Sequence, residues 1–235
     1  MCVNTLHHIE RLNEVDSTSD HLKRNRHRVK SGHLCVAHTQ TAGRGRQGHQ
    51  WHSAPGKNLT FSFMLDTRDN QPYDALMVTA LALMDVLTSY GIETAIKMPN
   101  DLFVGAKKIA GILIERTKTD EGEQTIIGVG LNVNEQLPAS MHPLAISMRM
   151  VKKTEFALED VLQAFIDQFN QRVHHPPFAA FRKQVLSQNQ TVQEGTQIVT
   201  LQDFDEMFVC KVYQGADIKF IPCDRLTFRM KQYKL

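Results

Sequence analysis

The sequence predicts an α+β protein: a larger domain with a mixed β-sheet packed with helices, then a small, all-β, barrel-like C-terminal domain. Three observations lead to this expectation. Residues 59–65 alternate apolar and polar or smaller side chains, with the period of a half-buried strand. Two longer segments carry apolar residues at helical spacing, and short strand-like segments separated by turn residues follow position 195. We expect the domains to span residues 1–186 and 187–235.

The helical segments are residues 71–90 and 158–173. The first places Leu76, Ala80, Leu83 and Leu87 on one stripe and ends at Gly91. The second stops before two consecutive prolines and carries its apolar residues on one face, namely Val161, Leu162, Phe165, Ile166 and Phe169. A short third helix is expected at residues 178–186, so the helices pack against a sheet in layers.

The polar stretch 187–195 is interpreted as a linker into the smaller domain. Strands are expected at residues 197–201, 206–213, 217–221 and 225–230, with turn signals such as Gln214-Gly215 between them. The role of this domain is inferred from its position alone.

Composition excludes several classes of protein. The 235 residues have a net charge of +2, too mild for a nucleic-acid-binding face. The basic run 21–30 is interpreted as a solvated helix end or loop rather than a binding patch. No stretch is apolar enough to span a membrane, and no signal peptide is visible. The four cysteines show no zinc spacing, and neither metal binding nor a disulfide framework is expected. A cytoplasmic location is therefore expected.

Residues 40–65 contain a loop suited to an anion. Gly43, Gly45 and Gly48 allow close backbone approach, Arg44 and Arg46 offer planar forks for carboxylate or phosphate oxygens, and the chain's only tryptophan, at position 51, adds a stacking surface. The glycines have dinucleotide-fingerprint spacing, but a strand follows where that motif requires a helix. No Walker-type phosphate loop occurs. A solvated basic loop of no function remains the other interpretation.

A second segment joins a proline turn to a strand that carries lysines. Asn100 and Asp101 supply an amide and a carboxylate at the turn after Lys97, and residues 107–115 form the strand. Strict alternation places Lys108 on the face of Ala110, opposite to Gly111. Because both faces are apolar, the strand should be covered on two sides, where a lysine requires an anionic partner.

A third segment, residues 126–134, is an apolar strand in which Gly128 and Gly130 share one face. Glycine inside a strand marks either close approach of a ligand or a bulge with tight packing between strands. Both interpretations remain open for this segment.

Together these segments resemble the biotin protein ligases, also called biotin–acetyl-CoA-carboxylase ligases, over about residues 10 to 175. Four motifs match in order and spacing: D-S-T-N as residues 16–19, G-R-G-R-x-G-x-x-W from Gly43 to Trp51, K-W-P-N-D as residues 97–101 with K-x-x-G-I-L-x-E as residues 108–115, and G-x-G-x-N as residues 128–132. Met98 stands where the family most often has Trp, while Gln47 and His49 replace frequent arginines and Ser19 replaces Asn.

The resemblance implies a two-step acylation. Biotin carboxylate attacks the α-phosphate of ATP, and a lysine of a biotin carboxyl carrier protein or domain then attacks the mixed anhydride. Like charges meet in the first step, so the site must supply cations, for which Lys108, Arg44 and Arg46 are the catalytic candidates. Mg²⁺ is expected with the phosphates, and the resemblance assigns it no protein ligand.

The resemblance also implies two groups of binding residues. The biotin-binding candidates are Ser17, Thr18, Gln40, Gly43, Arg44, Lys108, Gly111, Gly128 and Gly130. The ATP-binding candidates are Arg46, Trp51, Lys97, Asn100, Asp101 and Asn132. Ser17 is equally well explained as a helix N-cap, with Asp20 completing an S-x-x-D box.

Residues before Leu12 are too few for a DNA-binding domain, so DNA binding is not expected, and the chain should be a monomer or homodimer. One alternative function is a lipoate or octanoate ligase, whose R-R-x-S-G-G-G-type loop is absent here. The other is a catalytically silent biotin-binding module, which would not need Arg44, Arg46 and Lys108.

Overall fold

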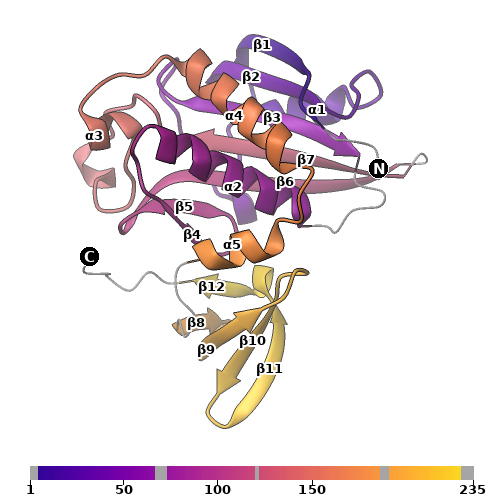
Figure 1. Cartoon of the computed structure of the whole chain (residues 1–235), viewed down its shortest axis with the longest axis vertical. Coiled ribbons are helices and arrows are strands. Elements are labelled where there is room, and N and C mark those ends of the chain that lie inside the picture. Colours follow the sequence, from indigo (N-terminus) through magenta and orange to yellow (C-terminus); the bar gives the residue numbers. More distant parts are fainter. Residues whose placement is uncertain (1–4, 67–72, 120–121, 186–190, 229–235) are drawn as a thin grey trace.

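A seven-stranded mixed sheet forms the centre of the larger domain (Figure 1). The computed structural model describes residues 5–66, 73–119, 122–185 and 191–228. The strand order is β1 (His8–Val15), β2 (His33–Gln40), β3 (Leu59–Asp66), β7 (Gly122–Leu131), β6 (Lys107–Thr119), β5 (Asp101–Val104) and β4 (Ala95–Lys97). β1 and β2 pair in parallel, and the other neighbours are antiparallel.

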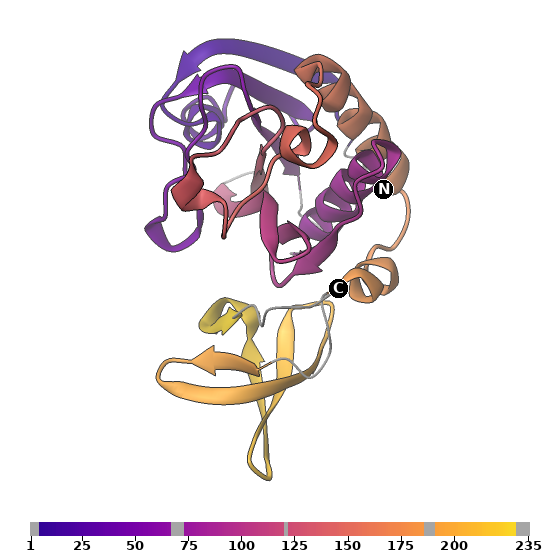
Figure 2. The ribbon, with the colours of Figure 1, turned by 90° about the vertical axis from the view of Figure 1, so that its left-hand side faces the viewer.

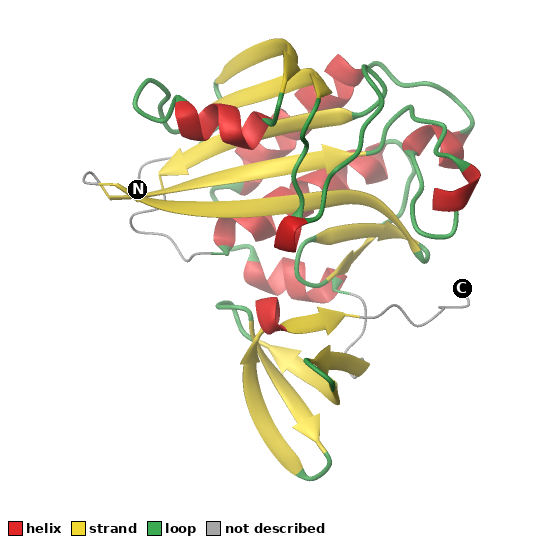
Figure 3. Ribbon diagram, turned by 180° about the vertical axis from the view of Figure 1, so that it is seen from behind, coloured by secondary structure: helices red, strands yellow, loops and turns green. Residues whose placement is uncertain are grey.

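Helices cover both faces of this sheet. α2 (Asp74–Ser89) and α4 (Leu158–Arg172) pack together on one face, and α1 (Thr18–Arg24) lies on the other, which Figure 3 shows from behind. α3 (Met148–Lys152) and α5 (Phe178–Gln184) are short. The expected apolar stripes of α2 and α4 are all buried, which confirms both predictions. Positions 71, 72 and 186, included in the expected helices, lie outside the described residues.

β3 differs from the half-buried strand that its alternation predicts. Phe61 and Phe63 pack against α4, with ring centroids 4.8 Å from Phe165 and 5.0 Å from Phe169 respectively. The alternate residue Ser62 is also fully buried, because α1 covers the second face of the strand. The polar alternation therefore marks a buried polar layer beneath α1 rather than a solvated face.

The smaller domain is a five-stranded antiparallel sheet, set beside α5 below the larger domain (Figure 2). Its order is β11 (Asp217–Pro222), β10 (Val209–Gln214), β9 (Gln197–Phe204), β8 (Thr191–Glu194) and β12 (Leu226–Phe228). The four expected strands are present, although positions 229 and 230 lie outside the described residues. The linker interpretation was wrong for residues 191–194, which form β8. The proposed domain boundary falls within residues 186–190 and lies outside the described part.

Aromatic rings join the two domains. Tyr73, just before α2, stacks on Phe208 of the smaller domain with ring centroids 4.5 Å apart. Phe181 of α5 lies 5.5 Å from the same ring. Since these rings are at least partly buried, the smaller domain is held against the larger one rather than only tethered to it.

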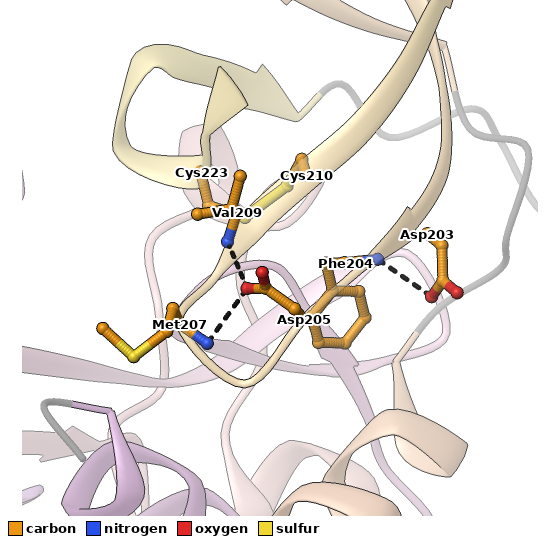
Figure 4. Close-up of a disulfide and its surroundings, with 7 residues drawn as sticks. All are labelled: Asp203, Phe204, Asp205, Met207, Val209, Cys210 and Cys223. Carbon is orange, nitrogen blue, oxygen red and sulfur yellow. Dashed lines mark hydrogen bonds between the residues drawn. A yellow bond between two sulfur atoms is a disulfide. The ribbon is translucent and has the colours of Figure 1, made fainter. Parts of the chain in front are cut away.

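A disulfide joins Cys210 of β10 to Cys223, which follows β11 (Figure 4). The expectation of no disulfide was therefore wrong for this pair, although Cys35 is free and buried. The two Cα atoms lie 5.9 Å apart, because the β10–β11 hairpin brings Cys210 opposite Ile221 and so next to Cys223. No helix among the described residues is long and apolar enough to cross a membrane.

Candidate active site

A cavity of about 330 Å³ lies over the α1 side of the large sheet, and it collects most of the residues singled out from the sequence. β12 of the smaller domain also contributes to its wall. Thirteen of the fifteen candidates line it: Ser17, Thr18, Gln40, Arg44, Arg46, Trp51, Lys97, Asn100, Asp101, Lys108, Gly111, Gly128 and Gly130. Four sequence-distant segments therefore converge on one space of the size that a small-molecule ligand requires.

Hydroxyl and amide groups form one wall of the cavity, which we call the polar end wall (Thr18, Ser19, Gln40 and Ser62). Gln40 Oε1 accepts hydrogen bonds from the Thr18 backbone N–H (2.8 Å) and from Thr18 Oγ1 (3.1 Å). Thr18 Oγ1 also lies 2.7 Å from Ser62 Oγ, which lies 2.9 Å from Ser19 Oγ. The wall joins the start of α1 to the end of β2 and the middle of β3.

Gln40 Oε1 can only accept hydrogen bonds, and this determines which hydroxyl donates in each pair of the wall. Because Thr18 gives its hydroxyl proton to Gln40, Ser62 must donate to Thr18, and Ser19 must then donate to Ser62. The three hydroxyl protons are thus used within the wall. What the wall offers to a ligand is oxygen lone pairs, together with the amide N–H groups of Gln40.

Ser17 begins α1 as its N-cap and accepts a hydrogen bond from the Asp20 backbone N–H (3.4 Å). This confirms the capping interpretation only in part. The Asp20 carboxylate does not return to Ser17, since it binds Lys23 and Arg44 instead, and the Ser17 N–H donates to Asp16. The cap fixes the helix end that presents Thr18 and Ser19 to the cavity.

Lys108 faces the cavity, so the face assigned to it by strict alternation was wrong. Its Nζ lies 2.7 Å from Asp101 Oδ1 and would lie only 2.8 Å from a Cβ at Gly111. The cause is a bulge: Phe103 pairs with Lys108 and Leu102 with Ala110, which leaves Ile109 as an extra residue. The bulge turns Lys108 to the face of Gly111, where Asp101 is the anionic partner that a half-buried lysine requires.

The two loop arginines have different partners. Arg44 pairs with Asp20 (2.5 Å) and Glu115 (3.3 Å), and the hydrogen bond to Asp20 raises the pKa of its guanidinium. Arg46 donates to Asn100 Oδ1 (3.0 Å), while Asn100 is itself held by its Nδ2 donating to the Ile112 carbonyl (2.6 Å). Arg44 thus fastens the loop to α1 and β6, and Arg46 lies at the proline turn.

Trp51 lies flat against the glycines of the sheet. A Cβ at Gly130 would lie 2.2 Å from its Cε2, and one at Gly111 would lie 3.3 Å from its Cζ3. Lys108 Nζ is 5.5 Å from the ring centroid, within cation–π range. The Trp51 Nε1 is buried and has no hydrogen-bond partner among the described residues. An orphaned buried N–H in a cavity is a donor available to a ligand.

Burial lowers the pKa of Lys97, and the nearby charge of Lys108 lowers it further, although Asp101 acts in the opposite direction. Lys97 ends β4, and the cis Met98–Pro99 peptide follows. Met98 is buried in the core, which agrees with a packing role at this departure from the family pattern. The cavity therefore contains a desolvated ammonium group beside Asp101 and Lys108.

Two candidates do not line the cavity. Asn132 is buried, and its Nδ2 donates to the Ile146 carbonyl (3.2 Å), so it connects β7 to the segment before α3. Gly43 packs against the backbone of its own loop, since a Cβ there would lie 2.4 Å from the Trp51 carbonyl oxygen. It allows the Trp51 N–H to donate to the Gly43 carbonyl (3.0 Å) and close the loop. Gln47 and His49, the other departures, do line the cavity.

Sequence reasoning missed several residues that line the cavity. Ser62 carries no motif, and its place in the polar end wall depends on the pairing of β3 with β2 and β7. Its only signal was a polar residue within an apolar strand. Ser19 was noted as a departure and not as a ligand. Leu226, Thr227 and Phe228 of β12 reach the cavity only through the docking of the smaller domain.

The chain resembles known proteins in sequence and in structure. The profile of the Biotin/lipoate A/B protein ligase family matches residues 12–132. The bifunctional ligase/repressor BirA of Escherichia coli (strain K12) is 39% identical over 124 residues, which cover 51% of this chain and 38% of that protein. BirA of Bacillus subtilis (strain 168) is 32% identical over 168 residues, covering 68% and 51% respectively. The chain thus spans about half or less of these relatives.

A solved structure matches across both domains. The biotin protein ligase of Aquifex aeolicus in complex with biotin and ATP has a TM-score of 0.81 and 25% identity, and the match covers 95% of this chain and 99% of that one. The family profile covers more than half of the chain, and the fold and the converging motifs agree with it. The chain therefore belongs to the Biotin/lipoate A/B protein ligase family.

Proposed function

We propose that this chain is an ATP-dependent biotin protein ligase, which forms biotinyl-5′-AMP and pyrophosphate and then transfers biotin to a lysine of a biotin carboxyl carrier protein or domain. One observation carries the proposal: a single cavity combines a wall of hydroxyl and amide groups with Lys108, Asp101 and the Arg46–Asn100 pair. The wall of hydroxyl and amide groups suits a neutral polar ring, and the cationic side chains Lys108 and Arg46 suit anions.

The polar end wall supports biotin as the acyl substrate. A ureido ring carries two N–H donors and one carbonyl acceptor. The lone pairs of Ser19 and Ser62 suit the N–H groups, and the Gln40 amide N–H suits the carbonyl. A dithiolane or a plain alkyl chain would leave these groups without partners, which is costly in a buried site. The wall therefore favours biotin over lipoate or octanoate.

The cationic groups support adenylation. Lys108 lies in the cavity as a donor for both the biotin carboxylate and the α-phosphate, where like charges must approach one another. Arg46 and Lys97 lie nearby for the phosphates, and the Trp51 ring offers a stacking surface to the adenine. Mg²⁺ would bind mainly to the phosphates. Asp101 is the only carboxylate among the described residues that line the cavity, and its oxygen suits this ion.

The test is biotin-dependent exchange of labelled pyrophosphate into ATP, with lipoate as the competing acyl substrate. We expect exchange with biotin, and we expect Lys108→Met to slow it by about 10²–10³-fold, the usual effect of removing one preorganised donor from a developing anion. Lys107→Met is the matched control, since Lys107 is adjacent in sequence and does not line the cavity.

Exchange with lipoate alone would assign the chain to the other branch of the family. No exchange with either acid, combined with tight biotin binding, would indicate a silent binding module. Transfer is tested separately with a biotin carboxyl carrier domain, whose lysine should become biotinylated.

A further inference from the structure

A second cluster of chemically reactive side chains lies outside the candidate active site, where β1, α1 and β2 meet. We call it the Glu10 cluster, and it consists of Glu10, His21, His33 and Cys35. His21 Nε2 lies 3.2 Å from both carboxylate oxygens of Glu10, and His33 Nε2 lies 3.0 Å from Oε2. None of the four lines the candidate active-site cavity, and the proposed adenylation chemistry does not use them.

The fold explains why these four residues meet. β1 and β2 are parallel and in a register that pairs His8 with His33 and Glu10 with Cys35. Residues two apart on a strand share a face, so His33 and Cys35 both lie beside Glu10. α1 packs over this part of the sheet, where Leu22 and Cys35 belong to one buried cluster, and it thereby brings His21 to the same place. Figure 3 shows α1 across this face.

The donor atoms are of the kinds that bind transition metals. The ligating atoms of Glu10, His21 and Cys35 all lie within 4.8 Å of one another. In a tetrahedral zinc site, bonds of about 2.0–2.3 Å place ligand atoms about 3.3–3.8 Å apart. Shifts of about 1 Å in these side chains would therefore bring them to coordinating distance. Sulfur and imidazole nitrogen select zinc-like ions over Mg²⁺ or Ca²⁺.

The set contains one carboxylate, one imidazole and one thiol. Coordination by Cys35 would release its thiol proton to solvent, as zinc commonly brings about, so metal binding at this site would be coupled to pH.

We propose that Glu10, His21 and Cys35 bind a zinc-class divalent ion, and that His33 orients the Glu10 carboxylate through its other oxygen. A partner that holds a metal ligand in place is a usual part of such sites. The ion would join α1 to β1 and β2. Because α1 presents Thr18 and Ser19 to the cavity, the site would stabilise the helix that forms the polar end wall.

The test uses the chain of 235 residues, reduced and freed of metal by chelation, titrated with Zn²⁺ alone and with Co²⁺ as a spectroscopic probe. We expect one ion per chain, a thiolate-to-cobalt charge-transfer band, and a higher Tm with Zn²⁺, since a ligand that binds only the folded state stabilises it. Cys35→Ser should abolish the band, and His33→Asn should weaken Zn²⁺ binding by about 10–100-fold.

The exposed His27, three residues beyond α1, gives a matched control, and His27→Asn should bind as the wild type does. Thermal unfolding without metal checks that each variant is folded. If Cys35→Ser is too unstable, His21→Asn tests the same site with the thiol retained and should also lose affinity. A band that persists in Cys35→Ser, or Zn²⁺ affinity unchanged in His21→Asn, would overturn the proposal and assign the ion to other thiols or surface histidines.

Discussion

Replacing Gly130 by alanine should displace the Trp51 ring from the cavity. The added Cβ would lie 2.2 Å from Cε2, 2.5 Å from Cζ2 and 2.7 Å from Cδ2 of the indole. Ordinary carbon contacts are about 3.5–4.0 Å, so the two groups must separate by about 1.3 Å or more. β7 cannot yield easily, because Gly130 pairs with Thr60 of β3 on one side and Gly111 of β6 on the other.

The ring must therefore move, and its contacts set the size of the effect. Overpacking of this kind costs about 1–3 kcal/mol of stability. Displacement also separates the ring from Lys108 Nζ, 5.5 Å away, and disturbs the Trp51–Gly43 backbone hydrogen bond that closes the loop. Biotin should bind at least about tenfold more weakly, the equivalent of about 1.4 kcal/mol.

Trp51 is the only tryptophan, so its intrinsic fluorescence reports the displacement directly. The Gly130→Ala emission should shift to the red as the indole becomes solvated. A double-mutant cycle with Trp51→Ala isolates the contact, because alanine removes the clash and the stability cost of Gly130→Ala should largely disappear. Gly128→Ala is the matched control: its Cβ would lie 2.8 Å from Ser19 Oγ, so it should weaken biotin binding without shifting emission. Unchanged emission in Gly130→Ala together with zero coupling would refute this reasoning.

Three further outcomes are expected. Biotin with ATP should change the Trp51 fluorescence of the wild type, and an unchanged spectrum at saturation would place the ligands elsewhere. Because burial lowers the pKa of Lys97 below its unfolded value, its ammonium form is disfavoured in the fold at neutral pH, so Lys97→Met should raise Tm by about 1–4 °C and weaken ATP binding. A lower Tm measured by calorimetry would contradict this. Thiol labelling of the unreduced, unfolded chain should modify Cys35 and leave Cys210 and Cys223 unmodified, and cleaving that 13-residue link should cost about 3 kcal/mol.

Local patterns predicted much of the site because most of its candidate residues lie in short segments with recognisable motifs. The glycines and arginines of the loop, the proline turn with Asn100, and the glycine pair of β7 each required a ligand or a close neighbour. All three segments border one cavity. The helical stripes were equally local signals, since a 3.6-residue period states which face is buried.

Three of the sequence predictions failed for one reason: they depended on how strands pair, and strand register cannot be deduced from residue spacing alone. The bulge at Ile109 depends on how β5 pairs with β6, and it reverses the face of Lys108. Ser62 enters the polar end wall through the neighbours of β3. Cys210 meets Cys223 only once the β10–β11 hairpin forms. None of these relations has a spacing that can be read along the chain.

Ion pairs tie the loop that carries Arg44 to its neighbours. Asp20 and Glu115 neutralise Arg44, and Glu115 also binds Lys23 at 2.6 Å. These contacts join the loop to α1 and β6. Because Arg44 binds carboxylates from two different elements, it acts first as a support for the cavity.

Lys108 is held differently, because its partner Asp101 lies within the cavity itself. Under the proposed function, an arriving carboxylate or phosphate would compete with Asp101 for the ammonium group, and Mg²⁺ bound with ATP would offer Asp101 another cationic partner. This exchange of partners would cost less free energy than breaking the ion pair outright, since neither side chain is left without an opposite charge. In this arrangement the internal ion pair would keep Lys108 positioned until the anions of the proposed reaction replace its partner.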